Sequence, residues 1–90
     1  MNKRTEILSA AIDLINGDRQ KDYGSPHKNF NDIAVMWSII LGVDLRADQV
    51  ALCMAGLKLA RLANGPHDDS YKDAAGYIAL AAELGLGNGN

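Results

Sequence analysis

One stretch of the sequence carries more polar and aromatic groups than the packing of a small domain requires. It runs from Asp18 to Phe30, with the letters DRQKDYGSPHKNF, and sets an aromatic ring and a glycine among several charges. Aromatic rings stack on planar bases, while cations and the free N–H groups at a helix start favour an anion. The candidate ligand-binding residues here are Arg19, Lys21, Tyr23, Gly24, Ser25, His27 and Asn29.

A second polar set lies downstream in the chain. Lys58 and Arg61 are three residues apart, so they share one face of a helix. Asp69, Asp73 and Tyr77 follow at a spacing of four and form one stripe on the next helix. A guanidinium matches a phosphate with two parallel hydrogen bonds. The two sets together predict a binding site for an anionic, ring-bearing ligand, and a nucleotide is the simplest such ligand.

The same residues admit a structural interpretation. If the last two helices form an antiparallel hairpin, Arg61 pairs with Asp69 or Asp73, and Lys58 reaches along the hairpin. The segment 23–26 is then only a turn with a helix cap, and its charges are solvated. From the sequence alone, both interpretations stay open.

Metal, cofactor and covalent chemistry have no support in the residue pattern. His27 and His67 stand in different loops, and neither has a partner at the spacing of metal ligands, so no metal or cofactor is predicted. Cys53 lies in an apolar run without a Cys or His neighbour, which predicts a buried, inert thiol. No GxxxxGK[ST] phosphate-binding loop occurs.

Four helices and no strand position these residues. Apolar periodicity, caps and breakers place them at about 3–16, from the Ser25 cap to Gly42, at about 47–63, and from about 68 to 84, where Gly85 stops the last one. We expect one helical domain over residues 1–84 and a flexible tail over residues 85–90.

The apolar residues then define the inner faces of the helices. Those expected to face inward on the second helix are Phe30, Ile33, Ala34, Trp37, Ile40 and Leu41. On the fourth helix they are Tyr71, Ala74, Ala75, Ile78, Ala81 and Ala82. The third helix is apolar nearly all round, which is typical of a central helix or of a subunit interface. The fold class is therefore all-α, a compact bundle of about four helices, assembled as a homo-oligomer.

Composition excludes several partners. The 90 residues are 48% hydrophobic and carry a net charge of −2, which is no footprint for duplex DNA. No run is long and apolar enough to span a membrane, and the first residues do not form a signal peptide. These features predict a protein of the cytoplasm.

Several motifs resemble a family of small domains of phages and prophages. They are DRQxxYGxPxxNF from Asp18, IAxxWxxxLG from Ile33, KLARL from Lys58, and DxxxDxAGY from Asp69. The resemblance covers about residues 7–83 and implies a phage-encoded all-α domain, with no established activity to transfer. The second half also resembles a phage group termed nucleotide modification associated, and more distantly the MazG-like nucleoside triphosphate pyrophosphohydrolases.

The pyrophosphohydrolase resemblance implies a magnesium site that this chain lacks in part. Those enzymes hold magnesium with an E-x-x-E pair on one helix and an E-x-x-D pair on another. The glutamates of this chain are Glu6 and Glu83, at opposite ends, and only Asp69 and Asp73 could stand for the second pair. Two cations on the third helix, where the first acidic pair would lie, favour capture of phosphate over metal-assisted hydrolysis.

Three hypotheses follow. The leading one is a phage protein that binds and sequesters a nucleotide or a nucleotide-derived, even cyclic, signalling molecule and thereby counters host defence. The alternatives are a metal-dependent nucleotide pyrophosphohydrolase of MazG-like type and a purely structural or interaction protein. Whether the chain is an enzyme stays open, with binding favoured.

Overall fold

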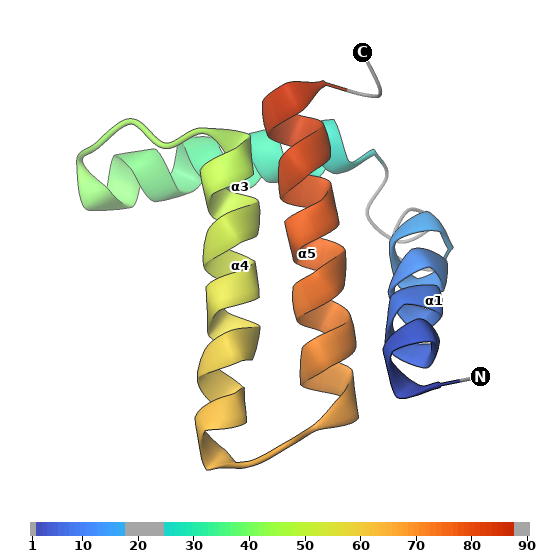
Figure 1. Cartoon of the computed structure of the whole chain (residues 1–90). Helices are drawn as coiled ribbons and strands as arrows, with labels where there is room; N and C mark the ends of the chain where they lie inside the picture. Colours follow the sequence, from blue (N-terminus) through green and yellow to red (C-terminus); the bar gives the residue numbers. More distant parts are fainter. Residues whose placement is uncertain (1, 18–24, 88–90) are drawn as a thin grey trace.

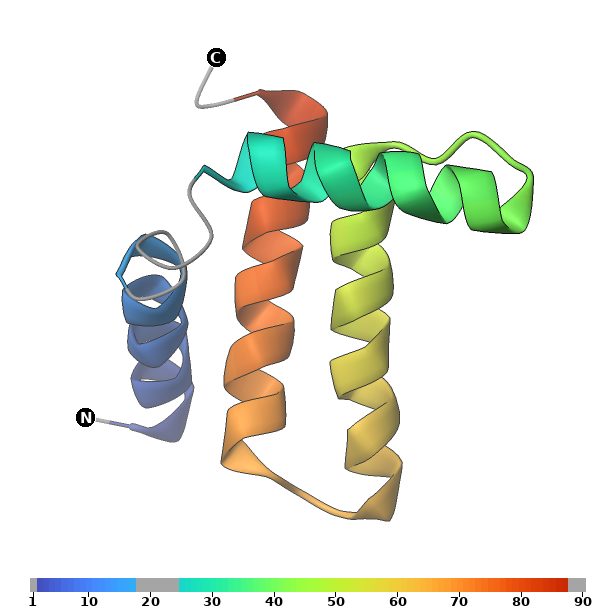
Figure 2. The same cartoon turned by 180° about the vertical axis from the view of Figure 1, so that it is seen from behind.

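The computed structural model describes residues 2–17 and 25–87. In these ranges the chain forms four α-helices, one 3-10 turn and no strand: α1 (Lys3–Asn16), α3 (Pro26–Leu41), α4 (Ala47–Arg61), η1 (Leu62–Asn64) and α5 (Asp68–Leu86). The predicted all-α class with four helices is confirmed. The helices α4 and α5 form an antiparallel hairpin, α1 lies beside α5, and α3 crosses one end of the hairpin (Figures 1 and 2).

Side-chain caps set where the helices begin. The Ser25 hydroxyl accepts a hydrogen bond from the N–H of Lys28 at 3.2 Å, and Pro26 occupies the first turn of α3, as predicted. At the start of α5, the Nδ1 atom of His67 accepts from the N–H of Ser70 at 3.3 Å. His67 is therefore a capping residue, a role that the sequence interpretation did not assign to it.

The helix ends show one error in the predictions. Gly42 closes α3 with a positive φ of 71°, a left-handed conformation that favours glycine. The expected stop of α5 at Gly85 is wrong, because the helix continues to Leu86 and ends at Gly87. Gly85 serves packing instead, since a Cβ atom there would lie 3.3 Å from the Oδ2 atom of Asp48.

The core lies where α3 crosses the α4–α5 hairpin. Phe30 and Val50 have no exposed surface, and small residues around them let the three helices approach closely. The buried core residues are Phe30, Ala34, Val50, Ala51, Leu80 and Ala81. The half-buried Trp37 packs against this cluster, so the prediction that Phe30 and Trp37 belong to the core is confirmed.

Several residues that were expected on the inner faces of the helices are exposed. Ile40 is 72% and Leu41 62% exposed, because the last turns of α3 project past α4 instead of running along it (Figure 2). On α5, Tyr71 and Ile78 are also about half exposed, and Ala82 is exposed.

The third predicted helix, α4, is not central in the bundle. It contacts α5 on one side and α3 at its start, and the opposite side, which includes Leu52, Leu57 and Leu59, is exposed. Cys53 is on this side, so the predicted burial of its thiol is wrong. Its apolar neighbours in the sequence indicated burial, but the described helices of the chain do not cover this side of α4.

In residues 2–17 and 25–87, no helix has the length and apolar character needed to cross a membrane.

Helix α1 is held against α5 by a close contact at a glycine. A Cβ atom built on Gly76 would lie 3.0 Å from the Cγ2 atom of Ile15, closer than most Cβ contacts in proteins. Gly76 is buried and in the middle of α5, where glycine costs about 1 kcal/mol of helix stability relative to alanine. The close approach of α1 is the physical reason for a glycine there.

We expect Gly76→Val to lower the free energy of unfolding by about 1–3 kcal/mol, because the added methyl groups overpack the contact with Ile15. The measurement is urea unfolding followed by circular dichroism. Ala79→Val is the matched control, since Ala79 is exposed on the same helix and carries only the cost of a β-branched residue. Equal losses in the two variants would contradict the tight contact.

Candidate functional site

The first predicted set is only partly within the described residues. Arg19, Lys21, Tyr23 and Gly24 lie outside them, so their predicted roles stay predictions. The described members of the set begin α3: the Ser25 hydroxyl is used as the helix cap, the Nε2 atom of His27 lies 3.7 Å from the Oε2 atom of Glu83, and Asn29 is half-buried.

The second predicted set lines the α4–α5 hairpin. The Nζ atom of Lys58 lies 3.1 Å from the Oδ2 atom of Asp73, and both side chains are largely buried, at 17% and 23% exposed. Tyr77 lies one turn further along α5, and its ring meets that of Phe30 edge to face at a centroid distance of 6.3 Å. Lys58, Asp73 and Tyr77 therefore tie the hairpin together up to the core.

The structural interpretation is right about Lys58 but wrong about Arg61. Asp69 pairs with Lys72 at 3.1 Å, and this hydrogen bond to the ammonium group holds the pKa of Asp69 below its ordinary value. Asp73 pairs with Lys58. With both carboxylates paired elsewhere, Arg61 makes no ion pair with any residue in the described ranges.

Arg61 borders a small polar hollow at the closed end of the hairpin. The hollow has a volume of about 300 Å³ and is lined by Arg61, Asn64, Gly65, Pro66, His67 and Ser70. Nδ1 of His67 lies 3.1 Å from the hydroxyl oxygen of Ser70. The hollow therefore combines a guanidinium, an amide and an imidazole next to the start of α5, where the helix dipole is positive.

A second hollow lies on the other side of Pro66, between α1 and α5. It has a volume of about 660 Å³ and is lined by Lys3, Arg4, Ile7, Leu8, Pro66, Asp68 and Tyr71. Its lining is mostly apolar and includes two cations, Lys3 and Arg4, and the carboxylate of Asp68, which lies 3.6 Å from Lys3. Arg4 is not among the predicted site residues, and Tyr71 was expected on the inner face of its helix. The packing of α1 against the start of α5 is a tertiary contact that local sequence patterns do not predict.

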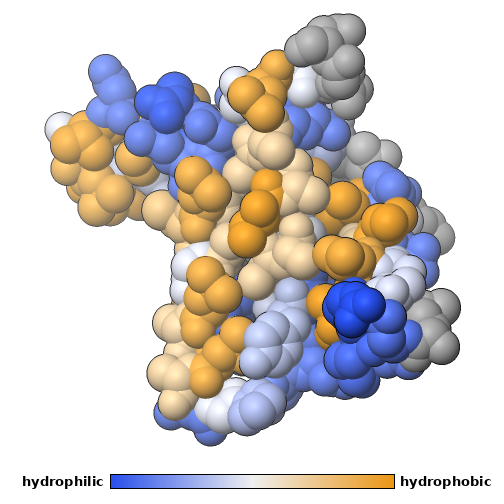
Figure 3. Space-filling view, in the orientation of Figure 1, coloured by the Kyte–Doolittle hydropathy of each residue, from blue (hydrophilic) through white to orange (hydrophobic). Residues whose placement is uncertain are grey.

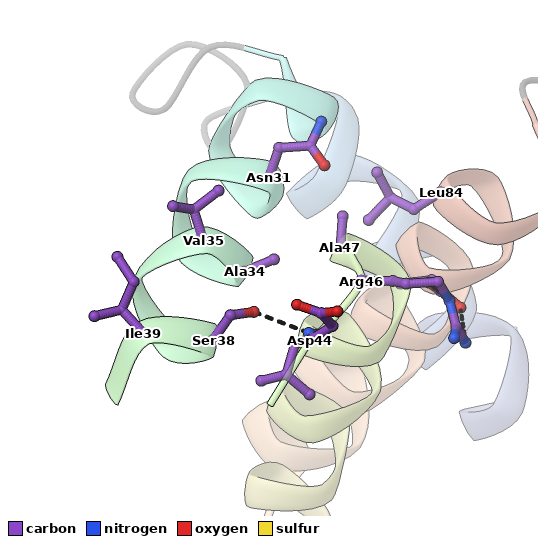
Figure 4. Close-up of a pocket in the computed structure, with 11 residues that line it drawn as sticks. Asn31, Ala34, Val35, Ser38, Ile39, Asp44, Arg46, Ala47 and Leu84 are labelled. Atoms are coloured by element: carbon purple, nitrogen blue, oxygen red, sulfur yellow. Dashed lines mark hydrogen bonds and ion pairs between the residues drawn. The ribbon is translucent and has the colours of Figure 1, made fainter. Parts of the chain in front are cut away.

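A third hollow lies under α3, where the chain turns into α4 (Figure 4). It has a volume of about 650 Å³, and its lining residues are Asn31, Ala34, Val35, Ser38, Ile39, Asp44, Leu45, Arg46, Ala47, Asp48 and Leu84. None of the predicted site residues is among them.

The polar groups of the third hollow mostly bind one another. The Ser38 hydroxyl accepts from the N–H of Leu45 at 2.8 Å. Arg46 donates to Asp48 at 3.0 Å, which holds the pKa of Asp48 below its ordinary value. This hollow therefore offers fewer open polar groups than its lining suggests.

The two predicted sets do not meet in the described part of the chain. His27 contacts Glu83, near the end of α5, whereas Arg61 and Asp69 lie near its start. Asp69 and Glu83 are 83 − 69 = 14 residues apart, which is about 21 Å along the helix axis. The length of α5 thus separates His27 from Arg61 and Asp69.

Over residues 2–17 and 25–87, no three His, Cys, Asp or Glu side chains are grouped in a way that could hold a metal ion.

Comparison with known proteins identifies the family to which the chain belongs. It is a member of the family described as a domain of unknown function, DUF6378, whose model matches residues 6–85. The predicted resemblance to a phage-encoded domain without an established function is confirmed.

Two similar curated proteins come from phages. The "Gene 55 protein" of Mycobacterium phage L5 is 39% identical over 82 residues, which is 89% of this chain and 53% of that protein. The "Gene 55 protein" of Mycobacterium phage D29 is 44% identical over 79 residues, covering 87% of this chain and 52% of that protein. The chain thus spans about half the length of these relatives. No solved structure matches it.

We expect the Lys58–Asp73 pair to stabilise the fold by about 1 kcal/mol, measured as the coupling energy between Lys58→Met and Asp73→Asn in a double-mutant cycle. The pair is largely shielded from water, so its coupling should exceed that of the exposed Lys28–Asp32 pair on α3, the matched control. A coupling energy near zero would mean that Lys58 is not engaged by Asp73 and is available to a ligand.

Proposed function

We propose that this protein binds a nucleotide or a nucleotide-derived signalling molecule, cyclic forms included, and sequesters it without turnover. It would act as a homo-oligomer in the host cytosol and counter a host defence. The observation that carries the proposal is the position of Arg61, which is exposed, forms no ion pair in the described ranges and borders a polar hollow. The similarity to two phage proteins supports a phage origin, and the part concerning host defence is an analogy based on that origin.

The neighbourhood of Arg61 suits a phosphate group. A guanidinium donates two parallel hydrogen bonds to phosphate, and the start of α5 adds the positive end of a helix dipole. The two carboxylates in the first turn of α5 are compensated by lysines: Asp68 lies 3.6 Å from Lys3, and Asp69 lies 3.1 Å from Lys72. An anion at Arg61 therefore meets less repulsion than the acidic residues of this turn would otherwise cause.

A stacking surface for the ring lies close to the same hollow. Tyr71 is 45% exposed and lines the apolar hollow that shares Pro66 with the hollow of Arg61. The exposed face of a tyrosine ring can stack on any nucleotide base. The proposal therefore places phosphate at Arg61 and the ring at Tyr71, with Tyr23 and its neighbours as a further, untested contribution.

The pyrophosphohydrolase alternative needs carboxylates that are free to bind magnesium. Asp69 and Asp73 are the candidates, and each is already bonded to a lysine ammonium group at 3.1 Å. Magnesium would have to displace both cations, and it prefers several converging oxygen ligands. This pairing supports binding over hydrolysis. The structural alternative draws its support from Lys58, which holds α4 to α5.

We expect wild-type protein to bind at least one member of a panel of mono-, di- and cyclic nucleotides in isothermal titration calorimetry. Arg61→Gln should weaken that binding by at least about tenfold, or about 1.4 kcal/mol, because the bidentate contact with phosphate is lost. Arg46→Gln is the matched control, since Arg46 lies at the opposite end of α4 and bonds Asp48.

Two outcomes would contradict this proposal. If wild-type protein binds none of the nucleotides, the structural alternative gains. If it releases pyrophosphate with magnesium, and Asp69→Asn or Asp73→Asn abolishes the release, the hydrolase alternative replaces sequestration.

A further inference from the structure

The projecting end of α3 exposes a cluster of apolar side chains. We call it the α3 arm and define it by Val35, Met36, Ile39, Ile40, Leu41 and Val43. Each of these side chains is more than half exposed, and Ile39 and Ile40 reach 70% and 72%. The sequence from Ile33 to Val43 contains no charged residue. Exposed apolar surface that lacks charge is the composition of an interface core.

The side of α4 that faces away from α5 has the same character. We call it the α4 outer face, and its residues are Leu52, Cys53, Gly56, Leu57, Leu59, Ala60 and Ala63, the last lying in η1. All seven residues are exposed and none is charged. In Figure 3, apolar residues colour both the projecting end of α3 and the side of α4 below it, and the molecular outline is hollowed between them.

Packing within the described residues of one protomer does not explain why position 56 is a glycine. A Cβ atom built on it would meet no atom within 4 Å, in contrast with Gly76. A glycine in the middle of a helix costs about 1 kcal/mol relative to alanine. Close approach of a helix from outside the protomer would give this glycine a purpose, as α1 does for Gly76.

We infer that the protein forms a two-fold symmetric dimer through these two surfaces. The α4 outer faces of two copies pack antiparallel, with Gly56 near the symmetry axis, and each α3 arm lies against the other copy's α4 outer face. The inference rests on the homo-oligomer in the proposed function and names its interface. It does not depend on nucleotide binding.

The dimensions of the protomer fit this arrangement. The last seven residues of α3, 35–41, extend over about 10 Å, and packed helices lie about 8–10 Å apart. An arm that projects past its own α4 therefore reaches across the α4 of a second copy. Each protomer carries both the α3 arm and the α4 outer face. A two-fold axis therefore pairs each of these surfaces with a surface of the other copy.

The area is also adequate for a stable dimer. The large apolar side chains on the two surfaces are each 52–72% exposed, and a standard interface buries about 800 Å² per partner. Flanking polar residues and the small residues of the α4 outer face would provide the remainder. Covering both surfaces would bury most of the large apolar side chains that α3 and α4 expose to solvent.

The first test enlarges Gly56. Wild-type protein should sediment in analytical ultracentrifugation at about 19 kDa, twice the chain mass of 9.6 kDa. Gly56→Leu should sediment as a monomer with unchanged far-ultraviolet circular dichroism, because the protomer has open space at this position. Ala79→Leu, at an exposed site on α5, is the matched control and should stay dimeric. A Gly56→Leu variant that remains a dimer would overturn the inference.

The second test addresses the α3 arm. Ile40→Asp places a charge in the interface and should raise the dimer dissociation constant by at least about 100-fold. Ile12→Asp, on the exposed side of α1, should leave it unchanged. Wild-type protein that sediments at 9.6 kDa would refute the dimer. If that monomer sediments with phosphatidylglycerol vesicles, the apolar surfaces bind a lipid surface. If it does not, the partner of these surfaces is a different protein.

The two proposals fail separately. Nucleotide binding is measured by calorimetry on the wild-type protein and on the Gly56→Leu monomer, whereas dimer formation is measured without ligand. A dimer that binds no nucleotide refutes only the proposed ligand. A monomer that binds a nucleotide refutes only the interface.

Discussion

The packing of α3 across the α4–α5 hairpin supports every other feature of this domain. Phe30 and Val50 are fully buried at the crossing, and the alanines around them bring the helix backbones close together. A domain of this size buries a smaller fraction of its surface than a larger domain does, so a well-packed crossing carries much of the hydrophobic stabilisation. Removing α3 would leave a two-helix hairpin with α1 on one side.

The concentration of the core at one helix crossing explains why apolar side chains elsewhere stay exposed. A helix that crosses a hairpin covers it only at the crossing, so the far end of α3 projects into solvent and the outer side of α4 stays bare. The residues that form these two surfaces are uncharged, and an uncharged apolar helix face is usually buried. Burial by a second copy resolves the difference between the sequence pattern and the exposure in one protomer.

The polar residues divide according to their distance from the core. Lys58 and Asp73 lie in the hairpin interface, largely shielded from water, where an unpaired charge would be costly, and they neutralise each other. Arg61 lies one turn further on, at the closed end of the hairpin, where water can solvate its charge. The same K-x-x-R motif thus provides one structural cation and one that remains available to a ligand.

The sequence by itself determined the class, the four helices and most of their boundaries. Caps and breakers such as Ser25, Pro26 and Gly42 act within a few residues and need no tertiary contact. Only the tertiary structure decided how the helices cross and which apolar faces they cover. It also decided that Lys58 rather than Arg61 pairs with Asp73, and that about 21 Å of α5 separates His27 from the closed end of the hairpin. Local periodicity shows which residues share a helix face, but the partner of that face depends on contacts between segments far apart in the chain.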